Sequence, residues 1–178
     1  MRSNGFAAIA GLSIATVWLT AGAPAARGQV PGADDLAIVV HRANPVDAVT
    51  VSELRRIFML DTQTWPSGRK ITVVLREKGQ PERAEAIRLI CGLSAPEFER
   101  HVLYQTFQGS VSIGPRSIQS ASAMLRFIFN TPGAIGYVRG DEVDEAVKVL
   151  KIDGRLPGEA MYPLRRAARI GKVSWPAW

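Results

Sequence analysis

The side chains that could support catalysis or metal binding are few and scattered along the chain. Of 178 residues, two are histidines, His41 and His101, and one is a cysteine, Cys91. The two histidines lie in unrelated contexts, so no metal site is predicted. Cys91 lies in the apolar stretch "RLICGLS", which favours a small buried hydrophobic residue over a reactive thiol. No GxSxG, P-loop or HExxH motif is present, so the sequence predicts a protein that is not an enzyme and needs no cofactor.

Polar side chains near expected helix starts and turns could instead contact a ligand. Ser117 and Ser120 in "SIQSASA" offer hydroxyl groups beside the free backbone N–H groups of a helix N-terminus, which suits an anion. Serine is also a preferred N-cap, and N-capping is the favoured interpretation, with ligand contact as the alternative. For Asn44 a turn role is likewise favoured over a ligand role, and for Trp65 packing is favoured over ligand stacking.

Alternating strands and helices must position these residues. Apolar, β-branched runs without a helical period predict buried strands at 36–41 and 71–75, and further strands are predicted at 134–138 and 146–152. Helices are predicted at 50–60, at 81–92, from 94 onward and at 121–129. This alternation predicts an α/β fold with a mixed, largely parallel sheet and flanking helices.

The stretch "NTPGAIGYV" contains the clearest backbone signals. Pro132 cannot continue the preceding helix, and Gly133 permits backbone conformations that other residues avoid. Gly136 lies inside the predicted strand, where a missing side chain lets a neighbouring backbone or a ligand come close. We therefore expect an inner strand with Gly136 in close backbone contact.

The first 28 residues have the layout of a secretory signal peptide. Arg2 precedes a mostly apolar run at 6–19 and then small residues at 21–28. The apolar run is shorter than the roughly 20 residues that span a membrane, so cleavage is favoured over an uncleaved anchor, and no later span is predicted. Residues 29–178 are then expected to form one domain with a basic C-terminal tail.

The charge balance narrows the class of partner. The formal net charge of +6 falls to +4 without residues 1–28, which contain Arg2 and Arg27 and no acids. Export argues against a nucleic-acid partner, so a small anion or an anionic envelope surface is the favoured partner.

Three stretches carry a resemblance to a known family: "NPVDAVTVSELRRIFMLDTQTWPSGRKITVVLRE", "NTPGAIGYV" and "VKVLKIDGRLPGEAMYPLRR". With the helices between them they cover roughly residues 36–166. In this combination the chain resembles small exported relatives of the phosphate-binding protein of ABC phosphate uptake systems. The resemblance implies a periplasmic binding protein-like (type II) fold of reduced size, without the N-terminal half that supplies part of the phosphate cage in two-lobed members.

The resemblance also implies a ligand site after the second strand. In the family this loop resembles Arg-Ser-Asp-Gly-Ser-Gly-Thr and grips phosphate at a helix N-terminus, whereas here it reads "REKGQPE". Arg76 and Gly79 match the pattern, but Lys78, Gln80 and Glu82 replace the aspartate, a serine and the threonine. A glutamate there suits the helix dipole but repels an incoming phosphate. The ligand-binding residues expected are Asn44, Arg76, Gly79, Gln80, Ser117 and Ser120.

The sequence therefore predicts an exported, periplasmic solute-binding-like protein that holds a small oxyanion such as phosphate. A membrane transporter or another envelope protein is the expected protein partner. The alternative is a degenerate single-lobe envelope module for protein–protein interaction that has lost the anion site. The position of the Arg76 side chain distinguishes these two hypotheses. An inward position in a concave pocket favours binding, and pairing with Glu77 or Glu82 favours loss.

Overall fold

The computed structural model describes residues 32–110 and 114–166. The predicted signal peptide lies outside the described residues, as does the chain after residue 166. Among the described residues, no helix is both long enough and apolar enough to cross a membrane.

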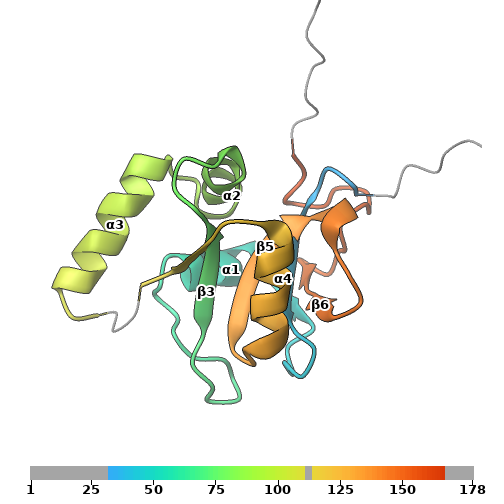
Figure 1. The fold of residues 1–178 in the computed structure, drawn as a ribbon, viewed down its shortest axis with the longest axis horizontal. Helices are drawn as coiled ribbons and strands as arrows, with labels where there is room; N and C mark the ends of the chain where they lie inside the picture. The colour runs from blue at the N-terminus through green and yellow to red at the C-terminus, as the bar shows by residue number, and fades with distance from the viewer. Residues whose placement is uncertain (1–31, 111–113, 167–178) are drawn as a thin grey trace, which may run out of the picture.

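The fold is built on a five-stranded sheet (Figure 1). Its strand order is β4 (Arg116–Ile118), β3 (Thr72–Arg76), β5 (Ala134–Arg139), β1 (Leu36–His41) and β6 (Val147–Val149). β3 is parallel to both β4 and β5, whereas β1 is antiparallel to both β5 and β6. Only β1 therefore runs against the other four strands, and the prediction of a mixed, mostly parallel sheet is confirmed.

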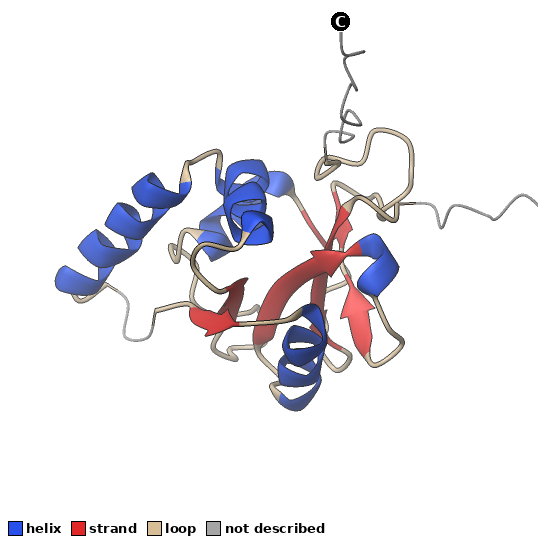
Figure 2. Ribbon diagram, turned by 45° about the horizontal axis from the view of Figure 1, so that its top comes forward, coloured by secondary structure: helices blue, strands red, loops and turns tan. Residues whose placement is uncertain are grey.

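Helices cover both faces of this sheet (Figure 2). α1 (Val51–Phe58) and α2 (Pro81–Cys91) pack on one face, α4 (Ala121–Asn130) covers the other, and α3 (Ala95–Phe107) packs against α2. Side chains along β1 alternate between the two cores. Leu36, Ile38 and Val40 join the core beneath α1 and α2, while Ala37 and Val39 face α4.

The helix boundaries follow local capping signals. Thr50 and Glu53 form a capping box at the start of α1, with the Thr50 N–H donating to Glu53 Oε2 at 2.8 Å. Hydrogen bonding to the Thr50 backbone lowers the pKa of Glu53. Ser94 and Glu97 repeat the arrangement at α3, and Gly92 ends α2 with a φ of 70°.

Two features of the sheet differ from the prediction. The single strand expected at 146–152 is divided at Leu150, which donates its N–H to the Ile38 carbonyl oxygen at 2.9 Å. Its second part, β7 (Lys151–Ile152), pairs in parallel with β2 (Ala48–Val49) in a separate two-stranded sheet. β4 was not predicted.

The packing around β5 explains why residues 133 and 136 are glycines. β5 is the central strand, as expected, and a Cβ on Gly133 would overlap the carbonyl oxygen of Lys70. A Cβ on Gly136 would lie 2.9 Å from Met124 Sδ and 3.0 Å from Ile128 Cδ1. The expectation of a close backbone contact at Gly136 was therefore wrong, since the neighbours are side chains of α4.

Candidate oxyanion site

The adjacent strands β3 and β5 both end in arginine, at the same end of the sheet. β3 ends at Arg76 and β5 ends at Arg139, while the antiparallel β1 begins there, with Leu36 opposite Arg139. The carboxyl ends of strands in open α/β sheets are where ligands commonly bind. The N-terminus of α4 lies beside this edge, because Ala121 and the two arginines line the same cavity.

Backbone hydrogen bonds hold Arg76 in place on both sides. Its N–H donates to the Tyr137 hydroxyl at 3.1 Å, and its carbonyl oxygen accepts from Arg83 Nη1 at 2.8 Å. Burial raises the pKa of Tyr137 to about 12, so this hydroxyl stays protonated at neutral pH.

The Arg76 side chain has spare donor capacity. Its Nε is buried and has no hydrogen-bond partner in the structure, and no ion pair with Glu77 or Glu82 is found among the described residues. A buried unpaired donor is costly, which makes this nitrogen a natural contact for an anion.

A cavity of about 10 Å³ adjoins the Arg76 side chain. Its charged lining consists of three arginines and three glutamates, namely Arg76, Arg139, Arg166, Glu82, Glu85 and Glu142. Space of this size holds about one water molecule. Glu82 also contributes a buried carboxylate oxygen, Oε2, that has no partner.

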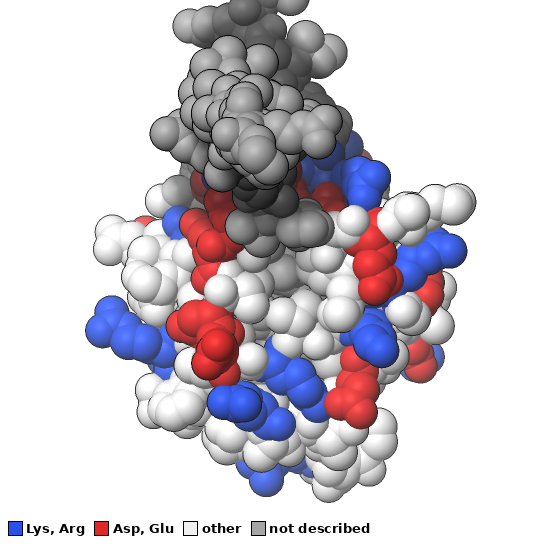
Figure 3. All heavy atoms as spheres, turned by 90° about the vertical axis from the view of Figure 1, so that its right-hand side faces the viewer, with Lys and Arg blue, Asp and Glu red and all other residues white. Residues whose placement is uncertain are grey.

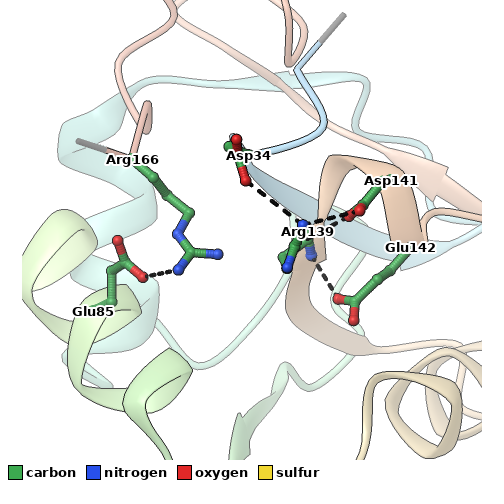
Figure 4. A network of polar contacts seen from close by, with 6 residues as sticks. All are labelled: Asp34, Glu85, Arg139, Asp141, Glu142 and Arg166. Carbon is green, nitrogen blue, oxygen red and sulfur yellow. Dashed lines mark hydrogen bonds and ion pairs between the residues drawn. The ribbon is translucent and has the colours of Figure 1, made fainter. Parts of the chain in front are cut away.

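Ion pairs at the rim occupy the other two arginines (Figure 4). Arg166 pairs with Glu85 of α2 at 2.6 Å, and the two side chains are only 14% and 21% exposed. Arg139 makes two hydrogen bonds to Asp141, at 2.9 and 3.1 Å, and lies 3.6 Å from Asp34. Among the arginines that line the cavity, Arg76 alone lacks a carboxylate partner in the described part of the chain.

The charges are mixed on the face of the molecule that forms the right-hand side of Figure 1 (Figure 3). Basic and acidic side chains alternate on this side of the molecule rather than forming a field of one sign. Nucleic-acid-binding surfaces instead carry a basic patch or stripe. No such patch is visible among the described residues on this face.

Gly79 and Gln80 lie away from this cavity, in the loop that leads into α2. Gly79 has a φ of 85°, and Gln80 is the N-cap of α2 but makes no side-chain capping bond. Both line a separate hollow of about 300 Å³ between α2 and α3, where Glu99 bonds Lys78 and the buried Arg83 at 2.7 and 2.5 Å. The structure does not bring Gly79 and Gln80 together with the Arg76 side chain in one pocket.

The remaining predicted site residues are separated as well. Ser117 lies in β4 opposite Leu75, so its expected place at a helix N-terminus was wrong, because β4 forms before the helix begins. Ser120 is the N-cap of α4, accepts from the Ala123 N–H at 3.1 Å and precedes a residue that lines the cavity. Asn44 follows β1 at the opposite edge of the sheet, where its Oδ1 accepts from the Val46 N–H at 3.0 Å.

Arg139 and Arg166 were missed by the sequence analysis. Arg139 had a usable signal, because it ends an apolar strand just as Arg76 does. Arg166 had none, since its position depends on the C-terminal segment folding back, with Leu164 accepting from the Leu36 N–H at 3.1 Å.

The histidines and the cysteine make structural contacts. His41 Nδ1 accepts from the Ala43 N–H at 2.9 Å, and His101 Nε2 lies 2.9 Å from the Met59 carbonyl oxygen. Burial raises the pKa of Cys91 to about 12, which makes the thiol a poor nucleophile. No cluster of three or more potential metal-binding side chains occurs within residues 32–110 and 114–166.

Comparisons with known proteins point to one family. Residues 17–164 match the family described as PBP superfamily domain. The structure is similar to an ABC-type phosphate transport receptor from Vibrio cholerae, with a TM-score of 0.57, 26% identity, and coverage of 70% of this chain and 48% of that one. It is also similar in fold to a putative phosphate ABC transporter substrate-binding protein with bound phosphate from Clostridium perfringens, with a TM-score of 0.57, 24% identity, and coverage of 70% and 47%. The chain thus spans about half the length of these solved structures.

Proposed function

We propose that this chain, which belongs to the family of PBP superfamily domains, is a non-enzymatic solute-binding protein that holds a small oxyanion such as phosphate at Arg76. The observation that carries the proposal is the buried, unpartnered Nε of Arg76 at the carboxyl edge of the sheet. A guanidinium group matches the geometry of an oxyanion, and its hydrogen bonds to a charged partner are stronger than those between neutral groups.

Glu82 favours an oxyanion that carries a proton. A carboxylate oxygen can only accept a hydrogen bond, and Glu82 Oε2 is buried without a donor. An oxyanion that carries a proton, such as hydrogen phosphate, can donate to this oxygen, whereas sulfate at neutral pH cannot. Phosphate is therefore the preferred oxyanion of the proposal.

Entry of phosphate requires the rim to open. The cavity of about 10 Å³ is too small for a phosphate ion. The Arg166–Glu85 pair closes one side, and an entering phosphate would replace Glu85 as the partner of Arg166. The site then becomes a pair of arginines, Arg76 and Arg166, facing one anion.

Calorimetric titration of residues 29–178 with phosphate and with sulfate tests the proposal. Arg76→Ala should weaken phosphate binding about ten- to a hundredfold, since a hydrogen bond to a charged group contributes about 1.5–3 kcal/mol. The exposed Arg88 of α2 offers a control with the same change of charge, and Arg88→Ala should bind like the parent. Glu82→Thr removes a like charge but also the acceptor of the phosphate proton, so at low salt it should tighten the binding of sulfate more than that of phosphate.

The outcome that ends the proposal is also clear. No binding by the parent at millimolar phosphate, and none gained by Glu82→Thr, would leave the envelope interaction module as the function. Equal losses in Arg76→Ala and Arg88→Ala would show that only the net charge matters.

The same proposal includes export to the periplasm and a membrane transporter as the protein partner. They rest on the signal-peptide layout of residues 1–28 and on the resemblance to phosphate transport proteins. The intact mass of protein extracted from the cell envelope should correspond to a chain that begins between residues 26 and 29. A full-length mass would contradict cleavage.

A further inference from the structure

Arg76 lies beyond the part of β3 that pairs with β5, so its backbone has no strand partner on that side. The register between β3 and β5 covers only Thr72 and Val73 of β3. On the other side β3 pairs with β4, where the Glu77 N–H donates to the Ile118 carbonyl oxygen at 3.1 Å. In such a parallel pair the preceding residue, Arg76, directs its N–H and carbonyl group away from β4. Side chains must therefore satisfy both groups.

Arg83, in the first turn of α2, supplies one of these side chains. Its Nη1 donates to the Arg76 carbonyl oxygen at 2.8 Å, while the Tyr137 hydroxyl accepts from the Arg76 N–H. The Arg83 side chain is only 6% exposed. A buried guanidinium group needs a carboxylate to offset the cost of its desolvation. The contact with Arg76 therefore depends on where that carboxylate lies.

The carboxylate belongs to Glu99 of α3. Its Oε1 accepts from Arg83 Nη2 at 2.5 Å, and its Oε2 pairs with Lys78 Nζ at 2.7 Å. The Lys78 side chain is 71% exposed, so water screens that pair more than it screens the pair with the buried Arg83. A chain of direct bonds thus runs from α3 through Arg83 to the backbone of Arg76.

We propose that Arg83 and Glu99 are positioning residues that fix Arg76 for the oxyanion, so that the affinity for phosphate depends on α3. This inference rests on the proposed function. Neither residue lines the Arg76 cavity, so both act through Arg76. Without Glu99, the Arg83 charge would be buried without a partner, and its side chain would turn toward water and release the Arg76 carbonyl oxygen. The end of β3 would then be held less firmly, and a binding group that is held loosely loses affinity.

Charge and positioning predict opposite effects when Glu99 is replaced. Loss of a negative charge would strengthen the attraction of an anion, whereas loss of positioning would weaken its binding. In calorimetric titration, Glu99→Ala should bind phosphate about tenfold more weakly than the parent. Glu145→Ala makes the same charge change at an exposed residue without an ion pair in the described part of the chain, and it should bind like the parent. Glu99→Gln keeps an acceptor for Arg83 and should recover part of the lost affinity.

Amide hydrogen exchange, measured by NMR without phosphate, reports on the position of Arg76 itself. The Arg76 amide is bonded to the Tyr137 hydroxyl, whereas Val74 lies fully buried in the middle of β3. Glu99→Ala should raise the exchange rate of the Arg76 amide about tenfold relative to that of Val74, because the end of β3 opens locally. A merely structural role would raise both rates equally through global unfolding.

Arg83→Lys is a milder variant in case Glu99→Ala does not fold. It keeps the charge but replaces the planar fork by a single ammonium group, so phosphate affinity and the exchange ratio should change in the same directions. Arg88→Lys, at an exposed residue of α2, is its control and should behave like the parent.

Two results would overturn the inference. One is phosphate binding by Glu99→Ala or Arg83→Lys that equals or exceeds the parent's, and the other is an equal rise of the two exchange rates. Absence of phosphate binding by the parent would instead end the proposed function, and the exchange ratio would still decide whether Arg83 and Glu99 position Arg76.

Discussion

The backbone N–H of Arg76 donates a hydrogen bond of 3.1 Å to the hydroxyl of Tyr137, across the gap where two central strands separate. The register between β3 and β5 covers only Thr72 with Ala134 and Val73 with Ile135. Beyond that point the Tyr137 hydroxyl takes the place of a backbone partner. The position of Arg76 at the cavity thus depends on a buried side chain of the neighbouring strand.

Tyr137→Phe should lower the free energy of unfolding by about 1–2 kcal/mol, because the partly buried Arg76 N–H loses its acceptor. Urea denaturation measures this change. Tyr104 is 61% exposed, and Tyr104→Phe is a matched control that should change stability little. Equal stability of the parent and Tyr137→Phe would mean that the Arg76 N–H has a second acceptor.

Gly136→Val should destabilise the protein by about 1–3 kcal/mol through overpacking against α4. The added side chain would meet Met124 and Ile128, whose atoms lie 2.9 and 3.0 Å from the position of its Cβ. A Cβ added at Gly114 would meet no atom within 4 Å, so Gly114→Val is the control. Thermal melting that is unchanged in Gly136→Val would contradict the packing described for α4.

Glu99 should make stability depend on acidic pH. Burial alone would raise its pKa, but hydrogen bonds from Lys78 and Arg83 outweigh this and hold the pKa below the ordinary value of 4.5. A lowered folded-state pKa stabilises the protein above about pH 4.5, and that contribution is lost as pH falls further.

Glu99→Gln should therefore be less stable than the parent at neutral pH, and the gap should narrow below about pH 4.5. Urea titrations across this range give the comparison. Glu145 is exposed and in no ion pair within the described residues, so Glu145→Gln should track the parent throughout. A gap that stays constant with pH would exclude the ion pair as its cause.

Glu82→Gln should relax the preference for phosphate over sulfate. The amide adds a donor where the parent has only an acceptor, and sulfate can accept from it. Calorimetry should show sulfate affinity rising by about tenfold relative to phosphate. Glu77→Gln changes the same charge outside the cavity lining and should leave the ratio as in the parent.

Elements whose signals are local were predictable from the sequence. Thr50 with Glu53 marked the start of α1, and Gly92 marked the end of α2, because capping involves residues close in the chain. Apolar runs gave β1, β3 and β5, since a strand buried on both faces has no polar alternation.

Features set by distant contacts were not predictable. β4 is a short polar edge strand that exists only because β3 pairs with it, so its sequence "RSI" carried no signal and Ser117 was placed at a helix start. At the site, the resemblance pointed to Arg76, and the structure adds the neighbours that surround its side chain. The Arg166–Glu85 ion pair joins residues far apart in the chain, so no local sequence pattern predicts it.

The ends of the described chain meet beside the Arg76 edge, where the Leu36 N–H donates to the Leu164 carbonyl oxygen at 3.1 Å. This fixes how the protein should be attached to a sensor surface. A thiol introduced at the exposed Ala160 would turn the oxyanion site toward the support, whereas one at the exposed Ser67, which precedes β3, would leave that site facing the solution. Because burial raises the pKa of Cys91 to about 12, the introduced thiol would be the one that reacts. Attachment through Ser67 should therefore give the larger response to phosphate.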